Sequence, residues 1–228
     1  MIEELLLKKG IDEEKAAKME SYARKLVEAN KTMNLTRITE PEEMAEKHFL
    51  DSILPCTLGL IAPGQSIVDV GTGAGFPGVP LAIMEPEAHF TLMDSVQKKL
   101  EFVHNAVDNL CSNVDILWIR AEEAAHIDQY REKFDLCVTR AVAYLPKLLE
   151  LTAGLVRVGG KILAYKGTEI MEELENSRNA LGKLNLKLVD IYQNPLVDNF
   201  HVLAVFEKKG SLQTQYPRKF SKIKAAPL

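Results

Sequence analysis

Cysteines, export signals and long apolar runs are scarce or missing in this 228-residue sequence. The three cysteines, Cys56, Cys111 and Cys137, are scattered, odd in number and without metal-ligand spacing, which argues against a disulfide framework or a cysteine metal site. No apolar run is long enough to span a bilayer, and the N-terminus carries acidic residues where a signal peptide needs basic ones. We therefore expect a cytoplasmic, globular monomer with reduced thiols, no metal ion and no membrane contact.

A large excess of either charge is also missing. The formal net charge of −4 argues against a surface that binds nucleic acid everywhere. Basic residues are concentrated near the C-terminus, where Arg218, Lys219, Lys222 and Lys224 lie within seven positions. We expect this segment to contact a polyanion, and the alternative is a solvated, frayed terminus.

The most informative segment is residues 67–78, which read IVDVGTGAGFPG. An apolar strand ends at three alternating glycines, Gly71, Gly73 and Gly75, and the proline that follows suits the first turn of a helix. A strand, a tight turn and a helix N-terminus form the nucleotide cradle of parallel α/β sheets.

The glycine pattern alone is compatible with two cofactors. Counted from Gly73, it matches the dinucleotide fingerprint. Counted from Gly71, with Asp69 two residues ahead, it matches the turn of S-adenosylmethionine enzymes, where the acid can hold the cationic amino-acid end directly or through water. Asp94, which ends the next strand, is placed to accept hydrogen bonds from ribose hydroxyls in both cases. A plain strand–turn–helix without a ligand is the remaining interpretation.

Strands and helices alternate along the chain from residue 65. We expect strands near 66–70, 89–93, 114–119, 134–139, 160–166, 186–192 and 202–206, and helices near 12–30, 41–54, 78–84, 96–110, 121–126, 145–156 and 168–183. Asp12 should cap the first helix, and the second should end before Pro55. This order predicts a Rossmann-like α/β fold with a mostly parallel, seven-stranded sheet and helices on both faces. We divide the chain into an N-terminal helical extension that packs on the sheet (1–64), the Rossmann-like core (65–207) and a basic tail (208–228).

Ligands of such sheets bind outside the carboxyl ends of the strands. Arg140 and Lys166 are expected there, Arg140 to position a substrate and Lys166 to position a phosphate. An arginine that only ties a strand end to a carboxylate is the alternative. Asn/Asp-Pro-Pro-Tyr, the motif of adenine amino-group methylation, is missing, and Cys137 lies within an apolar strand rather than beside a proline as a cytosine-attacking nucleophile would.

His48, Asp51 and Ser52 share one face of a predicted helix. Residues this close on one helix cannot easily form a hydrolase triad, and the G-x-S-x-G elbow is missing. We expect His48 and Asp51 to form a wall of the substrate mouth, and a polar face packed against the sheet is the alternative. Among the aromatic residues near the rim (Phe49, Phe76, Tyr144, Tyr165 and Phe200), we expect only Phe76 to stack on a base.

Eight motifs occur in a fixed order over almost the full length: NLT (34–36), HFLDS (48–52), DVGTGAGFPG (69–78), DS (94–95), RAEE (120–123), TRA (139–141), KG (166–167) and YPRK (216–219). With them the chain resembles the bacterial family of ribosomal RNA small-subunit methyltransferase G, also called GidB. The resemblance implies an S-adenosylmethionine-dependent enzyme that makes 7-methylguanosine in 16S ribosomal RNA near the decoding centre. It also implies cofactor contacts at Gly71, Phe76, Ala121, Glu122 and Arg140.

We group Asn34, from the first motif, with Lys166 and the four basic tail residues as RNA-binding positions. The partner would be naked 16S RNA or the small ribosomal subunit. A small-molecule methyltransferase is the alternative enzyme. An NAD-linked oxidoreductase would need a second substrate domain that this length does not supply, and a protein that binds the cofactor without chemistry is the last alternative.

The implied target atom, guanine nitrogen 7, has a lone pair and no proton, so positioning two reactants would suffice for catalysis. We therefore expect no general base, although His48 is a nearby group that could titrate between about pH 6 and 8. We also expect that Arg140 does not grip nitrogen 7. Asp51 or a backbone carbonyl near residues 139–141 would accept from the donor edge of guanine instead.

Overall fold

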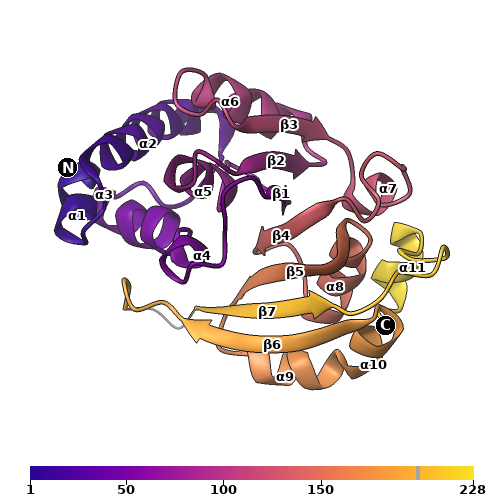
Figure 1. Cartoon of the computed structure of the whole chain (residues 1–228). Helices are drawn as coiled ribbons and strands as arrows, with labels where there is room; N and C mark the ends of the chain where they lie inside the picture. Colours follow the sequence, from indigo (N-terminus) through magenta and orange to yellow (C-terminus); the bar gives the residue numbers. More distant parts are fainter. Residues whose placement is uncertain (199–200) are drawn as a thin grey trace.

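The computed structural model describes residues 1–198 and 201–228. Its centre is one sheet with the strand order β3-β2-β1-β4-β5-β7-β6 (Figure 1). The strands are β1 (Ser66–Val70), β2 (His89–Asp94), β3 (Val114–Trp118), β4 (Phe134–Arg140), β5 (Val156–Lys166), β6 (Leu186–Gln193) and β7 (Val202–Lys208). Strands β1 to β5 are parallel, and β7 runs antiparallel to both β5 and β6. The predicted mostly parallel, seven-stranded α/β sheet is confirmed.

The chain reverses its direction of travel across the sheet between β1 and β4, which are neighbours. The connections that leave these two strands therefore diverge, and their carboxyl ends open the crevice where α/β proteins bind ligands. Both strands are mainly apolar and largely buried, as expected for the centre of a parallel sheet covered on both faces.

Helices cover both faces of the sheet, each over its own apolar cluster. The helical elements are α1 (Ile2–Lys8), α2 (Glu13–Met33), α3 (Pro41–Met44), the π-helical η1 (Ala45–Leu50), α4 (Leu54–Thr57), α5 (Gly78–Met84), α6 (Gln97–Val107), α7 (Ala121–Ala124), α8 (Leu145–Ala153), α9 (Ile170–Asn176), α10 (Arg178–Lys183) and α11 (Phe220–Ala225). The first cluster joins α1, α2, α5 and α6 to the sheet, and the second joins α7, α8, α10 and the C-terminal segment to it. The N-terminal helices lie on one side of the molecule and α7 and α11 on the other (Figure 1).

Several helix boundaries differ from the sequence-based expectation. The helix predicted over 41–54 is divided into α3, η1 and α4, and Pro55 lies in the first turn of α4, where its missing N–H costs nothing. The helix predicted over 168–183 breaks at Ser177, whose hydroxyl donates to the carbonyl of Glu173 at 2.7 Å. Helices α1 and α11 were not expected. Asp12 caps α2 as predicted, because its side chain accepts from the amide of Lys15.

The three cysteines are free thiols, and Cys137 is fully buried in β4, where burial raises its pKa well above the ordinary value. Among the described residues, no helix has the length and apolarity to cross a membrane. Within the same residues, no group of three or more acidic, histidine or cysteine side chains is arranged to hold a metal ion.

Candidate functional site

The glycine turn after β1 is supported by the N-terminal helix α2. Gly75 has a φ of +86°, and a Cβ there would collide with the hydroxyl of Tyr22. Tyr22 is fully buried in α2, and its hydroxyl donates to the carbonyl of Ala74 at 2.8 Å. Only glycine therefore permits this contact between α2 and the turn. The sequence shows Tyr22 only as part of an apolar helix face, since its partner lies 52 residues away.

Asp94 joins the ends of β1 and β2. Its Oδ2 accepts from the amide of Gly73 and its Oδ1 from the amide of Val96, both at 2.9 Å. The side chain lines a cavity although the residue is only 8% exposed. Asp94 thus shapes the turn, and the remaining lone pairs of its carboxylate can accept further hydrogen bonds.

Asp69 points away from that cavity. Its neighbour in β1, Ile67, belongs to the apolar cluster under α5, and the alternation of a strand turns Asp69 to the same face. There Oδ2 accepts from the amide of Gly78, the first residue of α5, at 2.8 Å. Burial raises the pKa of Asp69 to about 7, a rise that the nearby Thr72 hydroxyl and the Gly78 amide limit.

Three buried oxygen atoms in this region find no hydrogen-bond partner within residues 1–198 and 201–228. They are Asp69 Oδ1, Thr72 Oγ1 and Thr139 Oγ1. Buried polar atoms are normally satisfied by protein or water. Such a polar group behind the glycine turn fits the expected contact with the cationic end of a cofactor through water rather than directly.

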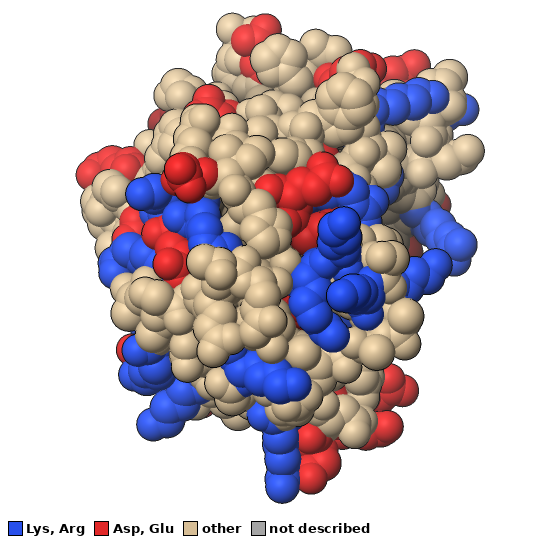
Figure 2. All heavy atoms as spheres, turned by 90° about the vertical axis from the view of Figure 1, so that its right-hand side faces the viewer, with Lys and Arg blue, Asp and Glu red and all other residues tan. Residues whose placement is uncertain are grey.

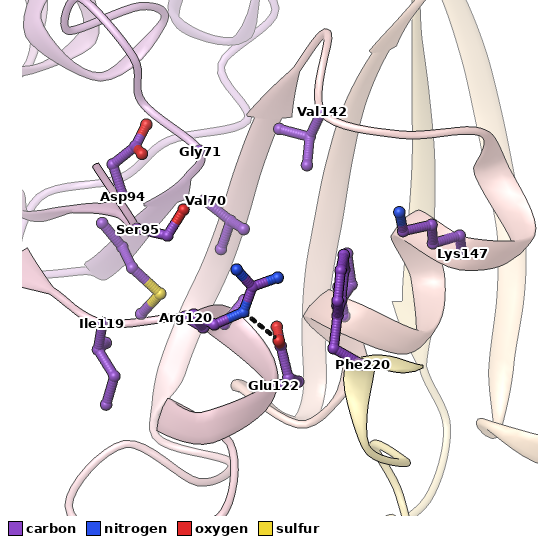
Figure 3. A pocket seen from close by; sticks show the side chains of 13 residues that line it. Val70, Gly71, Asp94, Ser95, Ile119, Arg120, Glu122, Val142, Lys147 and Phe220 are labelled. Atoms are coloured by element: carbon purple, nitrogen blue, oxygen red, sulfur yellow. Dashed lines mark hydrogen bonds and ion pairs between the residues drawn. The ribbon is translucent and has the colours of Figure 1, made fainter. Parts of the chain in front are cut away.

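A first cavity of about 210 Å³ opens beyond the carboxyl ends of β1, β2 and β3 (Figure 3). Its wall contains four of the predicted cofactor residues, Gly71, Asp94, Ala121 and Glu122. The other side chains are Val70, Met93, Ser95, Ile119, Arg120, Val142, Lys147, Leu151 and Phe220. An acid that can bind hydroxyls beside apolar walls suits a nucleoside, so the residues present fit the predicted cofactor.

A second cavity, of about 330 Å³, lies beyond the ends of β4 and β5. It brings together His48, Asp51, Arg140 and Lys166, the predicted substrate-positioning residues. Val142 lines both cavities, and a Cβ on Gly71 would lie 2.5 Å from its Cγ2. The loop after β4 therefore lies between the two cavities, and its Val142 side chain forms part of both walls.

Arg140 and Asp51 form a largely buried ion pair in the second cavity. Nη1 of Arg140 donates to Asp51 Oδ2 and to the carbonyl of Lys47, both at 2.9 Å, and the two side chains are 13% and 2% exposed. Burial alone would raise the pKa of Asp51, but His201 and Arg140 outweigh it and hold the pKa below its usual value. The arginine thus ties a strand end to a carboxylate and also lines the cavity.

His48 is held in a neutral form. Its Nε2 lies 2.9 Å from the hydroxyl of Thr36, and its ring stacks on Phe76 with centroids 4.5 Å apart. Burial, reinforced by the charge of Arg140, lowers the pKa of His48 to about 4. The expectation that His48 could titrate between about pH 6 and 8 is therefore wrong. Ser52 donates to the carbonyl of His48, so no hydrolase triad forms.

Phe76 belongs to the core rather than to a cavity wall. The residue is 7% exposed, and its ring also packs edge-on against Tyr22 and Phe49. Both expected roles of Phe76, base stacking and cofactor contact, stay predictions, and stacking would require these ring contacts to open. Asp69, Gly73 and Gly75 likewise line neither cavity. Phe200 lies outside the described residues.

Two predicted RNA-binding cations are engaged by acids. The ammonium of Lys166 lies 2.5 Å from Glu173 and also donates to the carbonyl of Ala143. The guanidinium of Arg218 donates to both carboxylate oxygens of Glu150 at 2.7 Å, and Glu150 is fully buried. A phosphate contact by either would have to compete with these pairs.

The remaining predicted RNA-binding residues are exposed. Asn34 ends α2 in the left-handed conformation that suits asparagine, with φ 50°. Lys219, Lys222 and Lys224 are exposed on the C-terminal segment. Figure 2 views the side of the molecule that carries α7 and α11, where Lys and Arg side chains gather beside Asp and Glu side chains. This face is mixed in charge, with cations available to a polyanion.

The strand order, the glycine turn and the acid that ends β2 are those of the Rossmann-like class I methyltransferase fold. Solved structures agree in fold. The Methanococcus jannaschii fibrillarin pre-rRNA processing protein has a TM-score of 0.52 and 18% identity, with 66% of this chain and 70% of that chain covered. A ribosomal protein L11 methylase from Lactobacillus delbrueckii subsp. bulgaricus has a TM-score of 0.54 and 16% identity, with 70% and 77% covered.

The chain belongs to the GidB family, rRNA small subunit methyltransferase G, whose model matches residues 15–195. Relatives of the chain carry the name ribosomal RNA small subunit methyltransferase G. One, from Caldanaerobacter subterraneus subsp. tengcongensis, is 42% identical over 89% of this chain and 86% of its own length. Another, from Clostridium perfringens strain SM101, is 39% identical over 98% of both chains. Fold and family together imply a methyl donor of the S-adenosylmethionine type.

Proposed function

We propose that this methyltransferase uses S-adenosylmethionine to methylate nitrogen 7 of a guanosine in 16S ribosomal RNA, near the decoding centre. The observation that carries the proposal is the pair of cavities that meet at Val142. One has walls suited to a nucleoside cofactor, and the other is lined by cations and by the carboxylates of Asp51 and Glu173. The setting would be the cytoplasm, with naked 16S RNA or the small subunit as the partner.

When bound, the cofactor supplies a methyl group activated by its positive sulfur. Asp94, Ala121 and Glu122 would hold the nucleoside portion, and the buried Asp69, behind the glycine turn, would reach the cationic end only through water. Because guanine nitrogen 7 bears no proton, the chain needs to supply no general base, and the neutral, hydrogen-bonded state of His48 accords with this.

Arg140 would position the substrate without gripping nitrogen 7. Within residues 1–198 and 201–228 its hydrogen bonds to protein come from Nη1 alone. The other guanidinium nitrogens can therefore donate to a phosphate or to the guanine carbonyl oxygen. An acceptor for the donor edge of guanine would come from Asp51 or from a backbone carbonyl near residues 139–141.

The test is methylation of 16S RNA and of isolated small subunits, both prepared from a strain that lacks the gene. The expected result is incorporation of one methyl group, which mass spectrometry of nuclease fragments places on nitrogen 7 of a guanosine. Protein with Arg140→Ala is the matched control, and its incorporation should be greatly reduced. Equal mass spectra for the deletion strain and its parent, with no incorporation in vitro, would contradict the RNA substrate and favour a small-molecule acceptor.

A further inference from the structure

The C-terminal segment reaches the wall of the first cavity. Phe220, the first residue of α11, lines this cavity together with residues from the ends of β1, β2 and β3. Figure 3 shows its ring standing between Arg120 and Lys147, on the side of the cavity away from Asp94. The family model matches only residues 15–195, so Phe220 lies beyond the matched region.

The ring of Phe220 contacts two cationic side chains, one next to α7 and one in α8. Cζ of Arg120, the residue before α7, lies 4.1 Å from the ring centroid, and Nζ of Lys147 in α8 lies 4.6 Å from it. These distances are in the range of cation–π contacts. Arg120 is itself fixed, because its Nε donates to Glu122 at 2.5 Å. The ring is therefore oriented by residues that also line the cavity.

The chain that leads to Phe220 is held by polar contacts, most of them partly buried. Arg131 donates to the carbonyls of Leu212, Gln213 and Tyr216, and His126 bonds the carbonyl of Pro217 at 2.8 Å.

Arg218, which follows Pro217, donates to Glu150 from its backbone amide and from its guanidinium. Glu150 is 0% exposed, so the pair is a strong constraint, since leaving that carboxylate unpaired would be costly. The segment is thus fixed to the fold at Arg218, and beyond it Ile223 of α11 is buried in the second apolar cluster.

From this arrangement we propose that Phe220 is a cofactor-contacting residue, and that the Arg218–Glu150 pair is its positioning device. The proposal rests on the proposed function, because it takes S-adenosylmethionine as the occupant of the first cavity. The C-terminal segment then has two parts with different roles. Phe220 closes the cofactor cavity, whereas the exposed lysines beside it remain available to RNA.

Isothermal titration calorimetry with S-adenosylmethionine and S-adenosylhomocysteine tests the proposal. Phe220→Ala should raise both dissociation constants by about tenfold, the effect of losing one aromatic stacking contact. Phe220→Leu, which keeps apolar volume and guards against misfolding, should lie between Ala and wild type. Ser221→Ala, the exposed neighbour in α11, is the matched control and should bind as wild type does. Fluorescence of Trp118, the sole tryptophan, gives a second readout, because its indole donates to Ser95 at the cavity wall.

To test the positioning role of the Arg218–Glu150 pair, both residues are changed together to Gln, because changing only one would leave the other charge without its partner. This double variant should bind the cofactor more weakly, and adding Phe220→Ala should cause little further loss, since both changes remove the same contact. Additive losses would overturn the positioning role. Wild-type affinity in Phe220→Ala, with weakened binding in Asp94→Ala, would overturn the contact itself and leave the proposed function standing. Unchanged affinity in both variants would overturn the cofactor assignment of the first cavity.

Discussion

Nη1 of Arg140 donates to Oδ2 of Asp51 at 2.9 Å across 89 residues of sequence. This bond joins the end of β4 to the helical layer that precedes β1, and it lies in the wall of the second cavity. The same guanidinium lies 5.7 Å from the ring centroid of Phe76 and 5.9 Å from that of Tyr165. One side chain thus connects the wall of the second cavity, the glycine turn and β5.

The Arg140–Asp51 pair should make a large contribution to stability. Arg140→Met leaves a carboxylate that is 2% exposed without its main cation. The free energy of unfolding should fall by about 3–5 kcal/mol, the usual effect of breaking a buried pair from one side. Urea unfolding measures it. Combining Arg140→Met with Asp51→Asn removes both charges and should recover most of the loss, and a single variant as stable as wild type would show that the pair is dispensable.

Asp94 should govern cofactor affinity. Asp94→Ala removes an acceptor for ribose hydroxyls and releases the amides of Gly73 and Val96. Hydrogen bonds to charged groups are worth about 1.5–3 kcal/mol, so affinity should fall by about ten- to a hundredfold. Calorimetric titration with S-adenosylmethionine checks this. Asp94→Asn retains one acceptor and should lose less, and the reverse order of the two variants would contradict the ribose role.

The sheet and the cradle could be predicted because their signals are local. The run before Gly71 is apolar except for Ser66 and Asp69, and the glycines and the acid that ends β2 follow at fixed spacing. Arg140 could also be placed at a rim, because strand ends of a parallel sheet meet at one edge, and His48 and Asp51 because their helix immediately precedes β1. Their pairing could not be predicted, since periodicity does not show which acid an arginine will meet.

The missed contacts join distant parts of the chain. Tyr22 reads as an ordinary apolar position of α2, and Phe220 reads as one aromatic residue in a basic tail. The tail was open to interpretation as a frayed end, because its anchors, Arg131 and Glu150, are isolated charges in the sequence. Only the folded structure shows that Glu150 is buried and that backbone carbonyls of the tail surround the guanidinium of Arg131.

The exposed tail lysines should supply the salt-dependent part of RNA binding. Changing Lys219, Lys222 and Lys224 to Gln removes three exposed cations without touching the Arg218–Glu150 pair. Each lost phosphate contact should lower the slope of log affinity against log salt by about 0.7–0.9. Filter binding of 16S RNA over a salt series measures the slope.

A matched triple variant at Lys8, Lys9 and Lys31, which are exposed near the N-terminus, serves as the control and should keep the wild-type slope. Equal slopes for both triple variants would mean that the tail lysines do not contact RNA and that the tail is a solvated terminus.

Asp69 should make stability depend on pH. Its pKa is raised from 3.8 to about 7, chiefly by burial, so the folded state holds the proton more tightly than the unfolded state. This contribution is fully present below about pH 4 and is lost as the pH rises through about 7. Asp69→Asn is neutral throughout and can still accept from Gly78, so its stability relative to wild type should rise between pH 5 and pH 8. This difference in the free energy of unfolding can change by at most about 1.4 kcal/mol per pH unit. Urea unfolding of both proteins at pH 5 and at pH 8 measures it. A constant difference would mean that Asp69 is ionised when folded.

The pH dependence of methyl transfer should identify a mechanism of positioning. His48 has a pKa of about 4, lowered first by burial, so it is neutral and does not change its charge between about pH 6 and 8. Single-turnover rates at saturating cofactor, which suppress any effect of Asp69 on cofactor binding, should therefore lack a base-type rise in that window. His48→Asn should lower the rate by a constant factor, because it removes the ring that packs on Phe76 but no proton acceptor. A log-linear rise in the wild type that vanishes in His48→Asn would make His48 a general base. The lowered pKa offers an independent check through stability. The contribution of His48 to the free energy of unfolding should be present above about pH 6.5 and be lost as the pH falls through about 4. His48→Asn should remove this pH dependence.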